Sequence, residues 1–134
     1  MLMTRASEYA LLSLIVIAKA EKPLDAESLA SELDISKSFL AKILQSMARQ
    51  GILNSYKGVN GGFALAKDSH EITVHEIMCA AEGKNPAVFD CAASEKNCPS
   101  DKAMSCHIWP FLNRLQGKID NFLDSLSLSD ILEG

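Results

Sequence analysis

Three cysteines in one polar stretch of this 134-residue chain are the residues best suited to redox or metal chemistry. Their spacing is Cys91-x6-Cys98-x7-Cys106, and His107 follows directly. Thiolates bind iron and zinc and can also be oxidised, so the stretch predicts a metal centre or a redox-active thiol site. The fourth cysteine, Cys79, lies apart from the others, and we expect it to be a small buried core residue.

The cysteine spacing favours some kinds of metal centre over others. Zinc ribbons and knuckles use closely spaced pairs of ligands, and the gaps here are wider. Wide spacing in a loop fits an iron–sulfur cluster. The spacing does not select a cluster type, and our expectation is [2Fe–2S] rather than [4Fe–4S]. Three thiolates leave one coordination position to a non-cysteine ligand, which this chain or a partner chain could supply. A metal-free site that switches by a disulfide such as Cys91–Cys98 is the alternative.

A basic stretch elsewhere in the chain predicts contact with nucleic acid, although the formal net charge of −4 argues weakly against it. The charge is uneven, because residues 1–67 hold eight basic and six acidic residues and residues 68–134 hold five and eleven. No acidic residue occurs from position 36 to 67, a stretch that carries Lys37, Lys42, Arg49, Lys57 and Lys67. Such a run of cations fits the phosphates of a nucleic acid.

The composition predicts one folded domain without a membrane partner. The chain is 48% hydrophobic and 22% charged, which is enough apolar material for a core. The longest apolar run, residues 9–18, is too short to span a bilayer, and the N-terminus has no export signal. We therefore expect a cytoplasmic protein, in which cysteines are reduced, metal-bound or redox-active rather than structurally paired.

The first half of the chain predicts three helices in succession. Thr4 can cap a helix that runs to about Lys19, and Asp25 can cap a short second helix. Ser36 can cap a third helix, which Gly51 would end. The turn between the second and third helices is only two residues long, as in a helix-turn-helix.

The rest of the chain predicts a hairpin, a loop and further helices. Asn60-Gly61 lies between two short apolar stretches and predicts a β-hairpin. Thr73 can cap a helix that ends near Gly83. Residues 85–105 lack periodicity and form the cysteine-bearing loop. A long helix then begins or bends near Pro110, and Ser127 caps a short tail helix.

The long helix carries an apolar stripe that one small domain cannot cover. We predict that this stripe packs against its copy in a homodimer. The stripe consists of Leu112, Leu115, Ile119, Phe122 and Leu123.

The order helix, turn, helix, hairpin predicts a winged helix-turn-helix fold. In this fold the third helix enters the major groove and the hairpin forms a wing beside it. Hydroxyl and ammonium groups would bind phosphates or base edges, and Ala41 could touch a thymine methyl. The predicted DNA-binding residues are Ser36, Lys37, Ser38, Ala41, Lys42, Lys57, Gly58 and Asn60. The alternative is a solvated basic face on a structural helical hairpin.

Several segments carry a family pattern: residues 2–4 and 8–10, residues 35–40 and 51–53, the glycine-rich wing 57–67, the cysteine triplet and the tail 127–132. Through them, and over nearly its whole length, the chain resembles the winged-helix transcription regulators of the IscR and NsrR type. This resemblance implies a homodimer with paired C-terminal helices and binding to a palindromic promoter in double-stranded DNA. It also implies a cluster held by Cys91, Cys98 and Cys106 near the dimer interface.

The same resemblance implies two candidates for the fourth cluster ligand. Some members of the family use an acidic residue in the first helix of the other protomer, which corresponds to Glu8. Others use a histidine three residues after the third cysteine, where this chain has Trp109. His107 is nearby, but adjacent helical residues point about 100° apart, so Cys106 and His107 are poorly placed to share one iron. We expect Glu8 of the partner chain, with His107 as the second candidate.

Two departures from the family pattern limit what the resemblance implies. The gaps between the cysteines are longer than in IscR, which bears on the cluster type. Ala41 stands where IscR has a glutamate that helps to select its sites, so the target preferences of IscR do not carry over.

These observations predict a transcription regulator, a repressor rather than an activator, whose DNA binding an iron–sulfur cluster controls in response to redox state, nitric oxide or iron–sulfur status. The alternatives are a metal-free thiol sensor of the same fold and a small iron–sulfur electron-transfer protein. We do not expect an enzyme, because no nucleophile–base pair or phosphate loop occurs. The expected regions are a winged helix-turn-helix domain (1–83), a cluster loop (84–106) and a dimerisation helix with tail helix (107–134).

Overall fold

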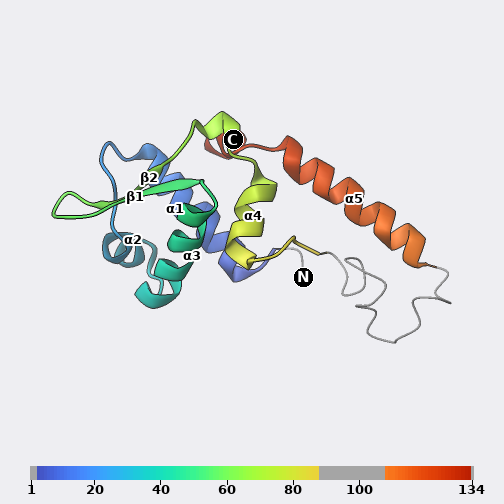
Figure 1. The fold of residues 1–134 in the computed structure, drawn as a ribbon, viewed down its shortest axis with the longest axis horizontal. Coiled ribbons are helices and arrows are strands. Elements are labelled where there is room, and N and C mark those ends of the chain that lie inside the picture. Colours follow the sequence, from blue (N-terminus) through green and yellow to red (C-terminus); the bar gives the residue numbers. More distant parts are fainter. Residues whose placement is uncertain (1–2, 88–107, 134) are drawn as a thin grey trace.

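The computed structural model describes residues 3–87 and 108–133, which form a set of helices with one small antiparallel sheet (Figure 1). The prediction of a mainly α fold with a β-hairpin is confirmed. In chain order the elements are α1 (Arg5–Lys19), α2 (Ala26–Leu33), α3 (Lys37–Arg49), β1 (Leu53–Tyr56), β2 (Gly62–Leu65), the 3-10 helix η1 (Ser69–Glu71), α4 (Val74–Glu82), α5 (Trp109–Ser125) and α6 (Leu128–Glu133).

Local capping explains where several helices begin. The side chains of Thr4, Asp25 and Thr73 each accept a hydrogen bond from the amide three residues further on. Such a cap contributes about 1 kcal/mol to helix stability. Ser36 stands at the N-cap position of α3, as predicted, but its side chain makes no capping hydrogen bond. Its hydroxyl instead shares a hydrogen bond with Ser38 Oγ over 3.1 Å.

The turn between α2 and α3 depends on one residue in the left-handed region. Asp34 has φ 56° and ψ 50°, and the Ile35 amide donates to the Ala30 carbonyl over 2.9 Å. Aspartate tolerates this conformation better than most residues. The turn sets the angle at which α3 leaves α2.

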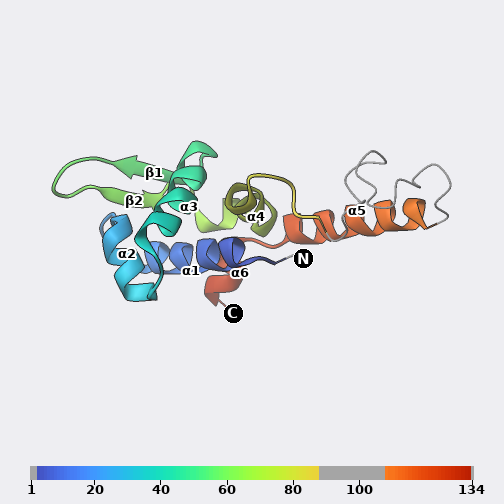
Figure 2. The ribbon, with the colours of Figure 1, turned by 90° about the horizontal axis from the view of Figure 1, so that it is seen from below.

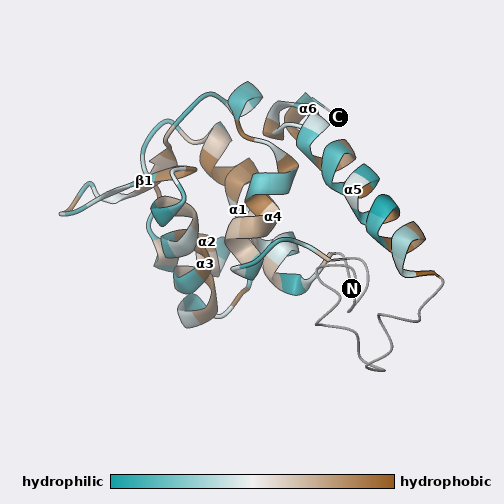
Figure 3. Ribbon diagram, turned by 45° about the vertical axis from the view of Figure 1, so that its right-hand side comes forward, coloured by the Kyte–Doolittle hydropathy of each residue, from teal (hydrophilic) through white to brown (hydrophobic). Residues whose placement is uncertain are grey.

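The main core lies where α1, α3 and α4 meet, and Figure 3 shows apolar residues concentrated on these helices. The contact between α3 and α4 also has a polar component, because Ser46 Oγ donates to the Ala80 carbonyl over 2.6 Å. Hydrophobic burial supplies the main driving force for this packing. Fully buried members of the core include Leu14, Leu29, Leu40, Leu44, Met47, Ile52, Ile72, Ile77 and Leu128.

The β1–β2 hairpin is attached to the body through the segment before α2. The Leu24 amide donates to the Phe63 carbonyl over 3.1 Å, and the Phe63 amide donates to the Leu24 carbonyl over 2.7 Å. Gly62, with φ 139°, lies so close to this segment that an added Cβ would stand 2.5 Å from the Leu24 carbonyl carbon. The hairpin thus gains a third extended partner in Leu24 and projects away from the helices (Figure 1).

The hairpin turn differs in detail from the expected Asn60-Gly61 turn. The bond that closes it joins the Gly61 amide to the Gly58 carbonyl over 3.0 Å, so Val59 and Asn60 are the central residues. A two-residue Asn-Gly turn needs positive φ at its asparagine. In this hairpin the positive φ angles fall at Gly58 and Gly62 instead. The longer loop carries the strand reversal without straining Asn60.

The C-terminal helices divide their contacts between two places. α5 packs on α4 through a second cluster in which Leu123 meets Val74 and Met78, with Ile119 beside them. α6 then returns to the main core, where Leu128 is fully buried. Figures 1 and 2 show α5 extending from the body on the side opposite the hairpin.

The apolar stripe predicted for dimerisation is therefore only partly free. Leu123 and Leu112 are buried in the isolated chain, whereas Phe111 is 54% and Phe122 63% exposed. The prediction that Leu123 packs against a second chain is wrong, because Leu123 already fills the contact between α5 and α4. None of the helices in the described ranges is long and apolar enough to cross a membrane.

Candidate nucleic-acid interface and cysteine segment

α3 turns one face into the core and the other towards solvent. Its buried face consists of Leu40, Ile43, Leu44 and Met47. Among the predicted DNA-binding residues, Ser36, Lys37, Ser38 and Lys42 are exposed, and Ala41 is half-buried. The helical spacing in the sequence thus separated the two faces correctly.

The N-terminus of α3 presents two hydroxyl groups to solvent. Ser36 Oγ and Ser38 Oγ lie 3.1 Å apart and both residues are exposed. One of these hydroxyls donates to the other, which leaves the second O–H to donate to a phosphate, and the partial positive charge of the helix end favours an anion there. This arrangement suits anchoring to a DNA backbone.

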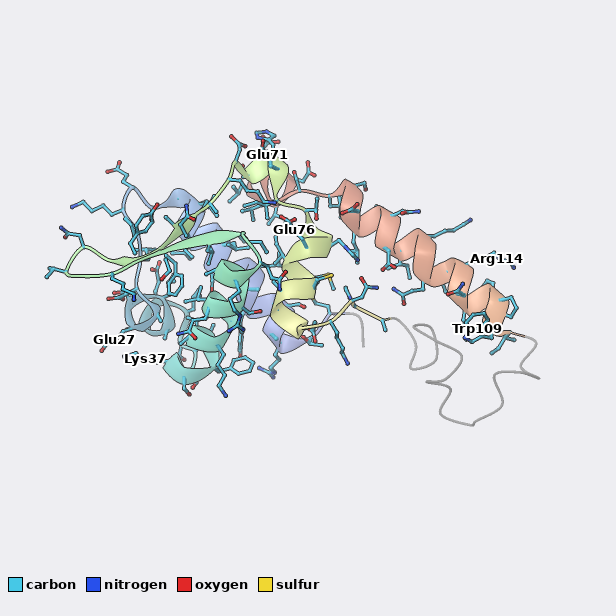
Figure 4. The ribbon with its side chains drawn as sticks, in the orientation of Figure 1. Glu27, Lys37, Glu71, Glu76, Trp109 and Arg114 are labelled. Carbon is cyan, nitrogen blue, oxygen red and sulfur yellow. The ribbon has the colours of Figure 1, made fainter. Side chains whose placement is uncertain are left out.

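The basic residues between positions 36 and 67 differ in whether a carboxylate lies within ion-pair distance of them. Lys37 Nζ lies 3.7 Å from the Glu27 carboxylate of α2 (Figure 4), and both side chains are largely exposed. An exposed pair of this kind is weak and can exchange for a phosphate. Lys67 Nζ lies 2.9 Å from the half-buried Glu76 carboxylate of α4. Residues 36–67 contain no acidic residue, but in the folded chain Lys37 and Lys67 each lie beside a carboxylate of another element.

Lys42 and Lys57 have no carboxylate within ion-pair distance among the described residues. Lys57, Gly58, Val59 and Asn60 are all exposed at the tip of the hairpin. The tip therefore offers an ammonium group, an amide and a glycine backbone that a nucleic acid could approach closely. Lys42 offers a second unpaired cation on the exposed face of α3.

The three clustered cysteines and His107 lie outside the described residues, so their placement stays a prediction. The described residue that ends α4 is Glu82, whose Oε1 accepts hydrogen bonds from the hydroxyls of Thr4 and Ser7, the latter over 2.9 Å. Ser7 is fully buried. The C-terminal end of α4 is thus tied to the N-terminus of α1, where Glu8 is exposed.

Cys79 is not the buried core residue that we predicted. It is half-buried, and its Sγ lies 3.9 Å from the ring nitrogens of His75 and 3.6 Å from Asn85 Oδ1. Burial, helped by the nearby carboxylates of Asp120 and Asp124, raises the pKa of the Cys79 thiol. A raised pKa lowers the thiolate fraction and makes Cys79 a poor nucleophile and metal ligand.

The described residues contain no group of three or more histidine, cysteine or acidic side chains that could hold a metal ion.

A polar junction between α4 and α5 was missed by the sequence reasoning. Gln116 is buried, and its Nε2 donates to the Pro86 carbonyl and to Asp120 Oδ1, each over 2.8 Å. Asp120 also lies 3.6 Å from His75 Nε2 and accepts from Asn85 Nδ2 over 3.4 Å. The available clue was the four-residue spacing of Gln116 and Asp120, which places both on one helix face beside the apolar stripe.

Comparison with known proteins identifies the family of this chain. The Rrf2 family, described as iron-dependent transcriptional regulators, matches residues 3–134. The chain belongs to the Rrf2 family. Among curated relatives, the putative HTH-type transcriptional regulator YffB of Lactococcus lactis is 30% identical over 90% of this chain and 80% of its own length. The HTH-type transcriptional regulator IscR of Photorhabdus laumondii is 27% identical over 98% and 79%.

Solved structures share the fold of this Rrf2 chain. CymR, the global cysteine regulator of B. subtilis, superposes with a TM-score of 0.71 at 24% identity, covering 98% of this chain and 95% of CymR. IscR of T. potens gives 0.70 at 21% identity over 98% and 85%. The oxidised form of Staphylococcus aureus CymR gives 0.71 at 22% identity over 100% and 98%.

The predicted function class is confirmed. This Rrf2 protein is a DNA-binding transcription regulator with a winged helix-turn-helix fold, and its family is one of regulators rather than enzymes. In helix-turn-helix folds the second helix of the pair lies in the major groove of DNA, and α3 holds that position in the order of elements here.

Proposed function

We propose that this regulator is a homodimeric repressor whose DNA binding is controlled by an iron–sulfur cluster on Cys91, Cys98 and Cys106. The observation that carries the proposal is the position of the three thiols. They lie in the segment between α4, which packs against the DNA-reading helix α3, and α5, which exposes an apolar face. A change at the cysteines therefore acts on the connection between DNA reading and dimerisation.

The DNA side of the proposal uses the residues that are exposed on α3 and the hairpin. Lys42 and Lys57 bind phosphates, and Ser36 and Ser38 anchor the N-terminus of α3. A two-fold dimer presents two copies of this surface, which explains why a palindromic site is expected. The family to which the chain belongs supports DNA as the partner.

The cluster side of the proposal follows from ligand chemistry. Three thiolates bind iron well, and a carboxylate in the fourth position makes a weaker bond that a signal could open. Glu8 is exposed on α1 and hence accessible to a second chain. We propose Glu8 of the partner chain as the fourth ligand, His107 as the second candidate, and [2Fe–2S] as the cluster type.

The deciding experiment is anaerobic purification with iron and sulfide assays, followed by footprinting with and without the cluster. We expect visible absorption, stoichiometric iron and sulfide, and a footprint that changes when the cluster is removed. Each of Cys91→Ala, Cys98→Ala and Cys106→Ala should abolish the absorption. Cys79→Ala is the matched control and should keep it, because Cys79 lies in the junction with Asn85 and His75.

A second experiment addresses the fourth ligand. Glu8→Ala should retain iron but change the redox potential or the lifetime of the cluster. Glu21→Ala, a change at an exposed glutamate beyond the end of α1, is the control and should leave both unchanged. If Glu8→Ala matches the wild type in spectrum, potential and lifetime, Glu8 is excluded and His107→Ala becomes the next variant to measure.

A metal-free thiol switch is the second candidate function. It rests on the cysteines themselves, because Cys91 and Cys98 are separated by only six residues and two such thiols can form a disulfide. A colourless protein that loses two hydrogen atoms on mild oxidation, with Cys91 and Cys98 joined in a peptide map, would establish this alternative.

A further inference from the structure

We propose that Gln116 is a positioning residue that sets the distance between the two DNA-reading helices of the dimer. It does so by fixing the angle at which α5 lies on α4. The inference rests on the proposed homodimer and deepens it, because it concerns which spacing of half-sites the dimer accepts.

The first part of the argument is the setting of Gln116. The residue is only 6% exposed, and its amide nitrogen donates to the Pro86 carbonyl and to Asp120 Oδ1. A buried amide has to keep its hydrogen bonds, and these bonds are directional. An apolar contact would allow α5 to roll or slide, whereas this amide selects one orientation of α5 relative to Pro86 and hence to the end of α4.

The second part is that Gln116 does not act alone. Asp120, one turn further along α5, accepts from Gln116 and from Asn85 and lies 3.6 Å from His75 Nε2 on α4. One more turn along, Leu123 packs against Val74 and Met78 of α4. A polar contact and an apolar contact on adjacent turns hold α5 at two points, which fixes an angle as well as a distance.

The third part is the connection from α4 to the DNA-reading helix. Ser46 Oγ of α3 donates to the Ala80 carbonyl of α4 over 2.6 Å, beside the buried Met47 and Leu44. The orientation of α5 is thus passed to α3 through two packed, hydrogen-bonded contacts. Close-packed interiors of this kind move as units rather than deform.

The fourth part is the distance along α5 between its contacts with α4 and its exposed apolar face. The contacts of α5 with α4 use the second half of α5, and its first half, which bears Trp109 and Arg114, extends away from the body (Figure 4). A helix rises about 1.5 Å per residue, so Phe111 lies roughly 8 Å beyond Gln116. A tilt of α5 at its junction with α4 therefore moves the exposed apolar face relative to α3. Because the dimer is two-fold symmetric, the same shift occurs in both protomers. The separation of two half-sites changes by only about 3.4 Å per base pair, so a small shift changes which separation fits the dimer.

The test compares half-site spacing preferences. Wild-type protein, purified anaerobically, first selects its half-site from a randomised duplex pool. Affinities are then measured on duplexes that carry two inverted half-sites at stepped separations, and on a duplex with one half-site. The variants are Gln116→Leu, which keeps the size but removes the hydrogen bonds, and Asp120→Ala, which removes the acceptor. Asn113→Ala, at an exposed position of the same helix, is the control. Iron content is matched across all proteins.

We expect the wild type and Asn113→Ala to share one sharp spacing optimum. In both junction variants the optimum should move by about one base pair, or its preference over neighbouring spacings should fall at least about threefold, with single half-site affinity within about twofold of wild type. An unchanged spacing profile in a folded, dimeric Gln116→Leu protein would overturn the inference. If that variant does not fold, Asp120→Ala decides in the same way. A monomeric wild type without any spacing preference would instead contradict the proposed homodimer.

Discussion

At the scale of single residues, the basic side chains differ in whether they form an ion pair with a carboxylate. Those without such a pair can bind DNA, whereas those with one stabilise the fold. Lys67 is paired with Glu76 of α4, whereas Lys42 and Lys57 have no carboxylate partner in the described part of the chain. A cation that already pairs with a half-buried carboxylate gains little from a phosphate, because it would have to abandon its first partner. The five basic residues of the stretch should therefore differ in their contribution to DNA binding.

Lys57→Ala should weaken binding to all DNA sequences by a similar factor, because a phosphate contact carries no base information. The slope of the logarithm of affinity against the logarithm of salt concentration should become shallower by about one unit. Fluorescence anisotropy across a salt series measures both quantities. Lys67→Ala is the matched control, and its slope should equal that of the wild type. An unchanged slope for Lys57→Ala would show that the hairpin tip is not a phosphate contact.

The conformation of Asp34 gives a prediction about stability. Its φ of 56° is unfavourable for any residue with a Cβ and worst for a β-branched one. Asp34→Val should lower the free energy of unfolding by about 1 to 3 kcal/mol. Asp34→Gly should leave it unchanged or raise it by up to about 1 kcal/mol. Urea denaturation distinguishes the two, and equal effects would mean that the α2–α3 turn adopts another conformation in solution.

At the scale of elements, the attachment of the hairpin to the segment before α2 makes the wing a fixed part of the fold. Two backbone hydrogen bonds join Leu24 to Phe63, and Gly62 fits directly against the same segment. A two-stranded hairpin alone is marginally stable in water. The position of Lys57 relative to α3 therefore depends on this attachment more than on the hairpin sequence.

Gly62→Ala should detach the wing. The new Cβ would meet the Leu24 backbone at 2.5 Å, and φ 139° is strained for alanine. We expect a loss of roughly 2 to 4 kcal/mol in the free energy of unfolding. Amide hydrogen exchange should show lost protection at Leu24 and Phe63. Retained protection at both amides in the variant would contradict this account of the wing.

Gly117→Ala should have the opposite effect. Gly117 lies inside α5, and nothing stands within 4 Å of the position where its Cβ would be. Alanine in a helix interior is more stable than glycine by about 0.5 to 1 kcal/mol. Thermal unfolding monitored by circular dichroism should show a raised midpoint. A lowered midpoint would reveal that this face of α5 is covered in the assembled protein.

At the scale of the whole molecule, α5 exposes an apolar face that a partner could cover. Phe111, Phe122 and Ile108 are each more than half exposed, while Leu112 and Leu123 are buried in the isolated chain. Large apolar side chains gathered on one projecting helix are typical of an interface. In the proposed homodimer this face packs against its copy in the second chain.

The double variant Phe111→Ser/Phe122→Ser should convert a dimer to a monomer. Both rings are exposed in the isolated chain, so the fold itself should change little in stability. Sedimentation equilibrium at micromolar concentration should give twice the protomer mass for the wild type and one protomer mass for the variant. Asn113→Ala serves as the control and should remain dimeric. A wild type that sediments as one protomer would refute the proposed dimer.

Local features of the fold were predictable because their causes lie within a few residues. The cap at Thr4, the cap at Asp25 and the two faces of α3 each depend on neighbouring residues and helical spacing. The cysteine triplet likewise pointed to metal or thiol chemistry by residue type alone. The sequence by itself therefore determined the order of the elements, the winged helix-turn-helix and the kinds of chemistry that the chain can support.

Contacts between distant residues were decided only by the tertiary structure. Lys67 with Glu76, Ser7 with Glu82 and Gln116 with Pro86 are pairs that no local pattern specifies. The closing turn of the hairpin is Val59-Asn60 rather than Asn60-Gly61, and Gly62 lies against the distant Leu24 backbone. Leu123, expected at a dimer interface, fills the contact with α4. The physical reason is common to these cases: burial and pairing depend on which surfaces meet in three dimensions, and periodicity along one helix shows an apolar face without showing what covers it.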